Sequence, residues 1–487
     1  MPTDLHALVA PSIAAFPDRT ALTTPDGQAV SYARLDATLD AFAAAATKFG
    51  LKAGDIVTLE IDNFAVQVCL VIALSRLGVT TVLGATTDGA LNAGLSLAAA
   101  ITLDPRQQPQ PKNLRFTQDW FTPPGKALPA TPGFAHDTDT ALIVTSSGTT
   151  GRRKYMPLSM AQIKARLPLF DPLYGTGHPN KMITIGAMTQ YGFMLILRTL
   201  NHGGMVMQPG NSPRRTLELL SAHGVDELCT SPNIVMDLVR DQHNNPVPLP
   251  ALKQIVVGGS GMSAKAMTEV QMHLCRRVLI SYGATEVGPI AVASSDELAG
   301  QPAGTVGHVR PGAEVVALNN SGAPLPPGQT GQLRIRVAPE LRIDHYLYAG
   351  AEGEASLQDG WFYPGDDGHI GKDNMLVITG RRSEVINIGG NKLSPDNVAA
   401  IATGINGVLQ AAAVGISNAA GYEDVCVAMV CDGTLSTDAM REALTNKLGR
   451  NTPLRVRIVE RLPHNAGGKL DRDTLRSLFS EPTPAPR

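Results

Sequence analysis

The residues whose types and spacing could do chemistry gather in glycine-containing segments, the first of which is residues 143–154, IVTSSGTTGRRK. An apolar strand leads there into seven consecutive Ser, Thr and Gly residues, and three basic residues follow. Glycine lets backbone N–H groups converge on an anion, hydroxyls add donors, and basic side chains add charge. The pattern predicts a loop that grips phosphate groups, with an ordinary polar turn as the alternative.

Other nucleotide and nucleophile motifs do not fit the sequence. The phosphate-loop pattern Gly-x4-Gly-Lys-Ser/Thr is absent at residues 143–154, and at Gly468-Lys469 it is broken by Pro463 and Leu470. Residues 259–264, GSGMSA, match a dinucleotide fingerprint, but no carboxylate follows about 20 residues later to hold a ribose. The same segment lacks the final glycine of a nucleophile elbow.

Two carboxylates stand at positions suited to a nucleotide. Residues 281–286, SYGATE, place an aromatic ring, a hydroxyl and Glu286 at the end of a strand. Such a set can stack on a base and hold Mg²⁺, because this ion takes oxygen ligands and accompanies phosphates. In residues 360–368, GWFYPGDDG, Asp366 follows a glycine turn and could accept two hydrogen bonds from a ribose diol. A solvated aspartate turn is the alternative for Asp366.

Two further segments whose residues could do chemistry contain basic side chains. Residues 380–395 read GRRSEVINIGGNKLSP, and residues 463–470 read PHNAGGKL, with Lys469 on a Gly-Gly loop. A lysine in such a loop is ordinarily a surface residue, so Lys469 has no assigned role from its local sequence.

The composition is typical of a cytoplasmic enzyme. The chain has 487 residues, enough for two to four packing units, and its hydrophobic fraction of 43% excludes a disordered chain. With 41 Lys and Arg against 43 Asp and Glu, a protein that coats nucleic acid is disfavoured. Five cysteines are too few and odd in number for a disulfide framework. We find no secretory signal and no membrane span, and therefore expect a cytoplasmic location.

Helix and strand signals alternate along much of the chain, which predicts an α/β fold with a largely parallel sheet. Residues 104–135, rich in Pro, Gln and Thr, are expected to form a surface excursion. Closely spaced glycines after residue 300 indicate antiparallel strands. The alternation of helix and strand signals resumes after Gly380. A domain boundary is expected near residue 382. The expected helices are 39–49, 65–77 and 395–405, and the expected strands are 54–61, 204–207, 254–257, 331–337, 410–416 and 425–431.

Taken together and in this order, the segments resemble the adenylate-forming superfamily of acyl-CoA synthetases, nonribosomal-peptide adenylation domains and luciferases. The resemblance runs from residues 17–22, PDRTAL, to Lys469. It implies a large N-terminal domain, residues 1–382, with two α/β subdomains and a small β-barrel. It also implies a small mobile α+β C-terminal domain, residues 383–487, hinged at Ser383.

The resemblance also implies site residues, position by position. Lys469, Thr285 and Glu286 would be catalytic, with Glu286 the Mg²⁺ ligand; Tyr282 would stack on adenine, and Asp366 and Arg381 would hold the ribose. Gly389 and Gly390 would line a CoA channel. The implied nucleotide contacts are Thr145, Ser146, Ser147, Gly148, Thr149, Thr150, Gly151, Lys154, Gly259, Ser260, Gly261, Tyr282, Gly283, Asp366, Arg381 and Lys392.

The reaction that the resemblance implies explains why these site residues are needed. A carboxylate is a weak electrophile, so ATP converts its oxygen into a leaving group and pyrophosphate departs. Both reactants are anions, so Mg²⁺ at Glu286 and the Lys469 ammonium would offset their repulsion. A thiolate then displaces AMP. Since Lys469 serves the first half-reaction, the family rotates the C-terminal domain between the two.

Several positions depart from the family pattern. Ser383 stands where the hinge usually has Asp or Lys, and Pro364 stands where Thr or Ser usually precedes the glycine. Arg153 and Tyr155 replace the Pro and Gly that usually flank the phosphate-loop lysine, and Lys392 replaces an Arg. Of these departures, those at Ser383 and Pro364 concern the hinge.

Two stretches of the sequence limit which carboxylic acid is activated and which thiol accepts the acyl group. Residues 188–193, MTQYGF, lack the carboxylate with which amino-acid-activating relatives bind an α-ammonium, so a free α-amino acid is disfavoured. Tyr191 and Phe193 are predicted to line an acyl pocket, with core packing as the alternative. The 80 residues from Glu286 to Asp366 leave little room for the insertion of fatty acyl-AMP ligases, which favours CoA as the acceptor. A carrier-protein phosphopantetheine and a nonenzymatic nucleotide binder remain alternatives.

Overall fold

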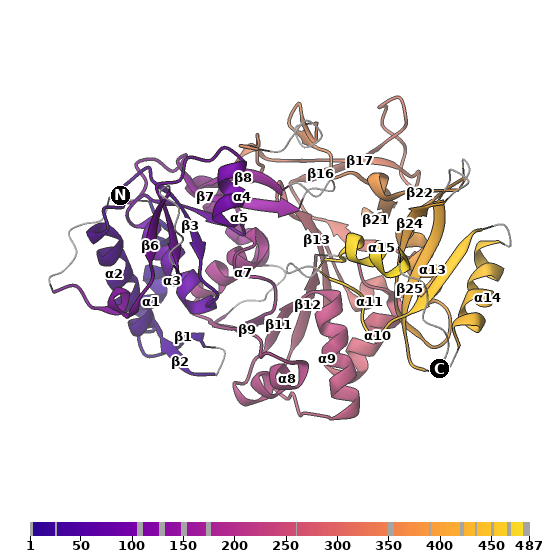
Figure 1. Ribbon diagram of the computed structural model, residues 1–487, viewed down its shortest axis with the longest axis horizontal. Helices are drawn as coiled ribbons and strands as arrows, with labels where there is room; N and C mark the ends of the chain where they lie inside the picture. Colours follow the sequence, from indigo (N-terminus) through magenta and orange to yellow (C-terminus); the bar gives the residue numbers. More distant parts are fainter. Residues whose placement is uncertain are drawn as a thin grey trace.

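Two large β-sheets flanked by helices make up most of the molecule, and a smaller sheet follows near the C-terminus (Figure 1). Of Ser147, Ser383, Asn391, Lys392 and Ser480 only the backbone is described. The computed structural model describes all other residues except 1–2, 25–26, 105–110, 126–131, 148–152, 172–176, 260, 349–354, 372, 389–390, 419–422, 434–435, 450–451, 465–468 and 481–487.

The first large sheet has six strands in the order β6-β5-β3-β4-β7-β8. Its strands are parallel except for β8, which runs antiparallel to β7. Strands β4 and β5 are buried throughout, as expected for parallel strands covered on both faces. The strands are β3 (Ile56–Glu60), β4 (Thr80–Leu83), β5 (Ala99–Thr102), β6 (Lys112–Arg115), β7 (Thr140–Ser147) and β8 (Arg153–Ser159).

The predicted helices beside this sheet are confirmed. They are α2 (Tyr32–Lys48) and α3 (Phe64–Ser75), and a short α4 (Thr87–Asn92) follows. Helix α2 begins seven residues before the predicted start, because the Ser31 hydroxyl accepts a hydrogen bond from the Arg34 N–H and caps it there. The longest helix in the described part of the chain is α2, with 17 residues, and a bilayer-spanning helix is absent there.

The predicted surface excursion at residues 104–135 is wrong for its middle part. Strand β6 extends the sheet, and a 3₁₀ turn (Gln118–Phe121) places Trp120 in the core with no exposed surface. The Trp120 ring contacts Phe42 and Phe49 of the α2 region, and its indole N–H donates to the Arg115 carbonyl at 3.0 Å. Apolar burial by these aromatic rings outweighs the polar composition of the flanking residues.

The second large sheet begins with parallel strands. Here β1, β10, β9, β11, β12 and β13 lie side by side in parallel, with β2 antiparallel at the edge. The strands are β1 (Thr20–Thr23), β2 (Ala29–Ser31), β9 (Asn180–Ile183), β10 (Met205–Met207), β11 (Glu227–Thr230), β12 (Gln254–Gly258) and β13 (Val278–Ala284). The helices of this unit are α1 (Leu5–Ala15), α5 (Met160–Arg166), α7 (Gln190–Asn201), α8 (Pro213–Ala222), α9 (Pro232–Asn244) and α10 (Ala264–His273).

The same sheet continues into antiparallel strands, as the closely spaced glycines predicted. Strand β14 pairs antiparallel with β13, and the path goes on through β15, β21, β20 and β17. The strands are β14 (Gly288–Ser294), β15 (Thr305–Val309), β16 (Ala313–Leu318), β17 (Gly331–Val337), β18 (Leu357–Gln358), β19 (Trp361–Phe362), β20 (Asp366–Ile370) and β21 (Met375–Arg381). Short helical segments are α11 (Ser295–Leu298) and a 3₁₀ turn (Pro339–Leu341).

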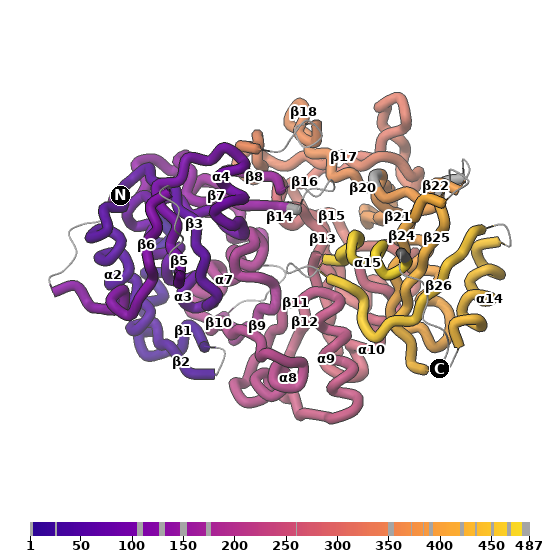
Figure 2. The backbone as a smooth tube through the Cα atoms, viewed as in Figure 1, coloured from indigo at the N-terminus to yellow at the C-terminus, as the bar shows by residue number. Residues whose placement is uncertain are grey.

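The C-terminal part has its own core and a sheet in the order β24-β25-β26. Figure 2 shows it beside α10 and β21, and the Lys265 ammonium of α10 donates to the Val408 carbonyl at 2.8 Å. Gly380, near the end of β21, has φ +152, and a Cβ there would lie 2.2 Å from the Ser394 hydroxyl oxygen. The elements are β22 (Ile386–Ile388), β23 (Asn391–Leu393), α13 (Pro395–Thr403), β24 (Val408–Ser417), β25 (Glu423–Cys431), α14 (Thr437–Leu448), β26 (Leu454–Ile458) and α15 (Arg472–Ser480).

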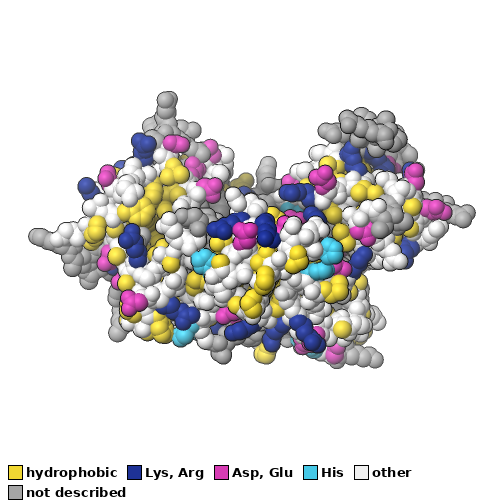
Figure 3. Space-filling model, turned by 90° about the horizontal axis from the view of Figure 1, so that it is seen from below, with side chains coloured by type: hydrophobic (Ala, Val, Ile, Leu, Met, Phe, Trp, Pro, Cys, Tyr) yellow, Lys and Arg dark blue, Asp and Glu magenta, His cyan; other side chains and the backbone are white. Residues whose placement is uncertain are grey.

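Charges of both signs mix on the surface. On the face shown in Figure 3, Lys and Arg side chains lie among Asp and Glu side chains. This arrangement agrees with the formal net charge of −2.

Candidate active site

The predicted phosphate loop joins two paired strands. Ser146 of β7 lies opposite Lys154 of β8, so the pairing carries the residues on both sides of the loop to one end of the six-stranded sheet. The Thr145 hydroxyl donates to the Leu83 carbonyl at 3.1 Å and ties β7 to β4. The loop residues Gly148, Thr149, Thr150 and Gly151 lie outside the described residues, as does the side chain of Ser147.

Lys154 reaches from β8 toward the second sheet. Its ammonium lies 4.0 Å from Glu286 Oε1, donates to the Ser356 hydroxyl at 3.3 Å and stands 4.9 Å from the centre of the Tyr346 ring. The side chain is largely buried, so these contacts are weakly screened by water. Lys154 therefore connects the phosphate-loop strand with Glu286.

Glu286 is 5% exposed and lies in the turn between β13 and β14. Its Oε1 accepts a hydrogen bond from the Tyr346 hydroxyl at 3.0 Å, and that hydroxyl is 2.7 Å from the Ser356 hydroxyl. Burial, followed by the Glu286 charge, raises the pKa of Tyr346, so the phenol stays protonated and remains a donor. The carboxylate orientation is thus set by a neutral donor and a nearby ammonium.

The backbone of Thr285 and Glu286 is held in place by Arg166. This guanidinium, with no exposed surface, donates to the Thr285 carbonyl at 2.8 Å, to the Glu286 carbonyl at 2.9 Å and to the Leu341 carbonyl at 2.9 Å. The Ile343 N–H also donates to the Glu286 carbonyl at 2.8 Å. Burial lowers the pKa of Arg166 to about 10, and it therefore stays charged at neutral pH.

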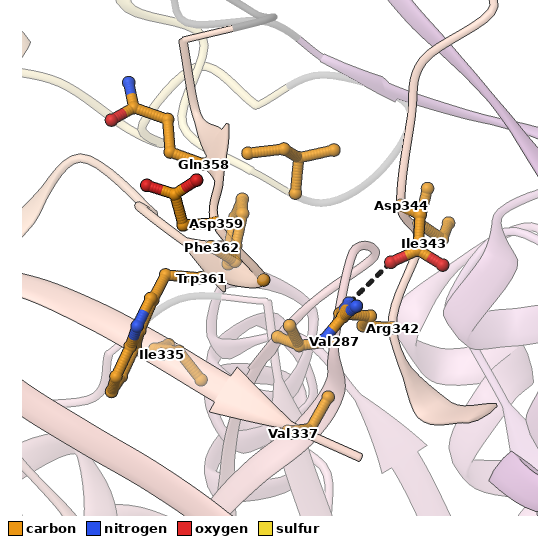
Figure 4. Close-up of a pocket in the computed structure, with 12 residues that line it drawn as sticks. Val287, Ile335, Val337, Arg342, Ile343, Asp344, Gln358, Asp359, Trp361 and Phe362 are labelled. Carbon is orange, nitrogen blue, oxygen red and sulfur yellow. Dashed lines mark hydrogen bonds and ion pairs between the residues drawn. The ribbon is translucent and has the colours of Figure 1, made fainter. Parts of the chain in front are cut away.

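A pocket lies beside this turn (Figure 4). Val287 and Ile343 form part of its wall, and the ion pair between Arg342 and Asp344 lies next to Ile343. The apolar part of the remaining wall comes from Ile335, Val337, Leu357, Trp361 and Phe362, and Gln358, Asp359 and Gly360 complete it.

Tyr282, Asp366 and Arg381 form a second cluster. Asp366 is 3% exposed; its Oδ2 accepts a hydrogen bond from the Tyr282 hydroxyl at 2.6 Å, and its Oδ1 is 3.0 Å from Arg381 Nε. Burial, and then the Asp366 charge, raises the pKa of Tyr282. The solvated-turn alternative for Asp366 is therefore wrong. A carboxylate has about four lone-pair sites, so Asp366 can accept further hydrogen bonds.

Gly283 allows β13 to turn toward these groups. The pairing of β13 with β14 shifts between Tyr282 and Gly283. A Cβ at Gly283 would lie 2.4 Å from the Gly288 carbonyl oxygen, closer than van der Waals contact permits. The glycine thus permits the irregular pairing that separates Tyr282 from the turn carrying Glu286.

Lys469 comes to these clusters from the far end of the chain. The residue is exposed to solvent, and charged protein groups still affect the pKa of its ammonium. Desolvation is the largest cause and lowers the pKa; Arg381 lowers it further, whereas Glu286 and Asp366 act in the opposite direction. Lys469 therefore shares one electrostatic environment with both clusters.

The two predicted acyl-pocket residues lie in different surroundings. Phe193 is 1% exposed and belongs to the main core, which fits the core-packing alternative. Tyr191 is partly buried, packs against Phe170 and faces Gly258, where a Cβ would lie 3.3 Å from the Tyr191 ring. Gly259 and Gly261 follow on the exposed side of the same strand end.

Several predicted residues cannot be placed in either cluster. Ser260, Gly389 and Gly390 are outside the described residues, and the side chains of Ser383 and Lys392 are too.

Sequence reasoning missed Tyr346, Ser356 and Arg166. Each is fixed by contacts with residues 10 to 202 positions away along the chain, and no local spacing marks them. Arg166 stands on a helix that is otherwise an ordinary capped segment.

The donor set fits a nucleotide with a divalent ion. Glu286 offers a buried carboxylate, which is the ligand type that Mg²⁺ prefers. Lys154 supplies positive charge beside Glu286, and Arg381 does so beside Asp366, as binding of a polyphosphate requires.

Comparison with known proteins agrees with this geometry. The sequence profile described as "AMP-binding enzyme" matches residues 9–339. Oxalate–CoA ligase of Saccharomyces cerevisiae is 27% identical over 72% of this chain and 65% of its own length, so that match spans less than two thirds of the relative. A fatty acid–[acyl-carrier-protein] ligase, MmaC of Mycobacterium marinum, is 27% identical over 96% of each chain.

Solved structures share the fold over nearly the whole chain. ATP-bound MatB from Rhodopseudomonas palustris has a TM-score of 0.83 at 20% identity and covers 99% of both chains. The amide bond synthetase McbA from Marinactinospora thermotolerans has a TM-score of 0.77 at 21% identity, over 98% of this chain and 99% of its own. With the family profile spanning most of the chain, this protein belongs to the AMP-binding enzymes, the adenylate-forming superfamily.

Proposed function

We propose that this protein activates a carboxylic acid with ATP to form an acyl-adenylate and pyrophosphate, and then transfers the acyl group to the thiol of CoA. The observation that carries the proposal is the pair of buried carboxylates Glu286 and Asp366, each beside a cationic side chain. Both carboxylates also affect the pKa of Lys469, which lies more than 100 residues later in the chain. Carrier-protein phosphopantetheine is the second candidate acceptor, supported by the full-length match to MmaC.

Each part of the site has a task in this reaction. Asp366 would accept hydrogen bonds from the ribose hydroxyls, and Tyr282, held by Asp366, would offer its ring to the base. Glu286 would hold Mg²⁺, which when bound neutralises phosphate charge. Lys154 and the loop beside it would bind the outer phosphates.

Lys469 would act at the point where charge develops. The acid oxygen attacks the α-phosphorus, a P–O bond forms, and the bond to pyrophosphate breaks with its electron pair leaving on pyrophosphate. An ammonium placed between two approaching anions lowers their repulsion most in the transition state. Holding both reactants also removes much of the entropic cost of their meeting.

The second half-reaction requires a thiol where Lys469 now lies. We place the moving part at residues 383–487, which meet the N-terminal part through contacts such as that of Lys265 with the Val408 carbonyl. A boundary near residue 382, with Ser383 as the hinge, allows this part to rotate and withdraw Lys469.

Acid-dependent exchange of labelled pyrophosphate into ATP tests the proposal. We expect exchange with at least one acid in a panel of aliphatic, aromatic and dicarboxylic acids, and no exchange with free α-amino acids. Free CoA should then release AMP, whereas release that requires a phosphopantetheinylated carrier protein would identify the second candidate. ATP binding without exchange for any acid would refute the enzymatic proposal.

The pH dependence of exchange should report the Lys469 ammonium. Because desolvation lowers its pKa, the charged form is lost at lower pH than for an ordinary lysine, so the exchange rate should fall as pH rises through this pKa. The K469R variant, which stays charged, should retain whatever activity it has to higher pH. A pH–rate profile with the same alkaline limb in both proteins would contradict the assignment.

A further inference from the structure

Arg166 is a fully buried guanidinium beside the site, and the reaction described above assigns it no task. Its Nε, Nη1 and Nη2 each donate to a backbone carbonyl, at 2.8 to 2.9 Å, and two of these carbonyls belong to Thr285 and Glu286. Charge-assisted bonds of this kind are stronger than neutral ones, and a rigid planar fork fixes their directions.

The helix that carries Arg166 follows directly from the phosphate-loop strand. Strand β8 contains Lys154 and ends at Ser159, which caps α5 in a capping box with Gln162. One turn before Arg166, the Gln162 amide donates to the Arg342 carbonyl at 2.6 Å. Helix α5 therefore holds the Thr285–Glu286 turn and residues 341–342 with side chains from one face.

A cavity lies beside the Thr285–Glu286 turn. Val287, the next residue, borders the pocket of Figure 4, and Ile343 forms the wall beside it. A turn next to incompletely filled space can shift more easily than one in a filled core. The hydrogen bonds from Arg166 and the Ile343 N–H to the Glu286 carbonyl oppose that shift.

We propose that Arg166 is a positioning residue that sets the Glu286 carboxylate at a fixed distance from Lys154, and so sets the affinity of the site for the magnesium form of the nucleotide. The inference rests on the proposed function, in which Glu286 holds the ion. Arg166 acts through the backbone and touches neither ion nor nucleotide. Groups that orient a metal ligand typically change metal affinity or activity by about 10- to 100-fold when altered.

The test uses the full-length protein and R166K, which keeps the charge but offers a single nitrogen in place of the fork. The control is R198K, since Arg198 is similarly buried at 2% exposure but pairs with the Asp171 carboxylate and not with the carbonyls of Thr285 and Glu286. ATP binding is measured by calorimetry with and without MgCl₂ in the absence of any acid, and Mn²⁺·ATP binding is measured by electron paramagnetic resonance. Thermal melting is recorded for all proteins.

We expect wild type and R198K to bind ATP more tightly when Mg²⁺ is present, and R166K to lose about 10-fold or more of that gain while binding metal-free ATP as before. R166Q, which keeps one amide donor, should behave like R166K. An unchanged response to Mg²⁺ in R166K, or an equal loss in R198K, would overturn the proposal. So would failure of both R166K and R166Q to fold while R198K folds, because the role would then be structural.

The two proposals can fail separately. If wild type shows no acid-dependent exchange, the proposed reaction is wrong. The calorimetric comparison of ATP binding with and without Mg²⁺ still tests the positioning role of Arg166. If exchange is normal and the Mg²⁺ response of R166K is normal, the reaction stands and Arg166 has no positioning role.

Discussion

Replacing Lys469 by alanine should reduce acid-dependent ATP–pyrophosphate exchange by a factor on the order of 10² to 10³, as found when one preorganised donor to a developing charge is removed. Glu286, Asp366 and Arg381 all affect the pKa of this ammonium, and in the proposed reaction the loss should fall on the step in which two anions meet. ATP binding should weaken far less, because Lys154 and Arg381 keep their contacts.

The matched control for K469A is K447A, which removes an equal charge from the exposed last turn of α14. K447A should exchange at the wild-type rate. Thioester formation from chemically prepared acyl-adenylate should be nearly unchanged in K469A, because the lysine is not needed once the adenylate exists. Equal losses in both half-reactions, or in both variants, would show that Lys469 serves stability and not adenylation.

The second large effect concerns stability, at the buried ion pair between Lys181 and Glu227. These residues lie on the adjacent strands β9 and β11, with 2.6 Å between Lys181 Nζ and Glu227 Oε2 and no exposed surface on the lysine. Burial lowers the pKa of Lys181 and raises that of Glu227, so desolvation opposes both charges. E227L would leave the ammonium buried without its counter-ion and should destabilise the fold by about 3–5 kcal/mol.

A thermal melt would detect this as a fall in Tm of about 3–6 °C. The double variant K181M/E227L removes both charges and should melt near the wild-type temperature, since apolar replacement of a buried pair is often neutral. The control D137A breaks the exposed pair of Asp137 with Lys164 and should cost less than about 1 kcal/mol. A double variant no more stable than E227L would contradict the charge-burial explanation.

The sequence predicted well those features that depend on local patterns. Alternating helix and strand signals predicted the α/β units, and glycine spacing predicted the antiparallel strands, because periodicity and backbone freedom are properties of short segments. Trp120 shows the limit: it lies in a segment rich in Pro, Gln and Thr, but its ring packs against Phe42 and Phe49, and no local pattern indicates these distant contacts.

The candidate site likewise contains residues that a sequence motif indicates and residues that no motif indicates. Tyr282, Glu286 and Asp366 stand in recognisable motifs, whereas Tyr346, Ser356 and Arg166 act through contacts that exist once the chain is folded. Phe193 and Tyr191 are two residues apart on α7, and the turn of the helix directs the first into the core and the second toward Gly258. Sequence spacing alone cannot assign such directions when both faces are apolar.

The tight approach of Gly380 and Ser394 has a consequence for natural variation at that position. Any side chain at residue 380 would collide with the Ser394 hydroxyl in the arrangement seen here, but the collision disappears if residues 383–487 rotate away. If the rotation proposed above takes place, a methyl group at residue 380 would disfavour the arrangement seen here and would not meet Ser394 in the rotated one. Glycine at this position would then preserve the proposed reversible motion.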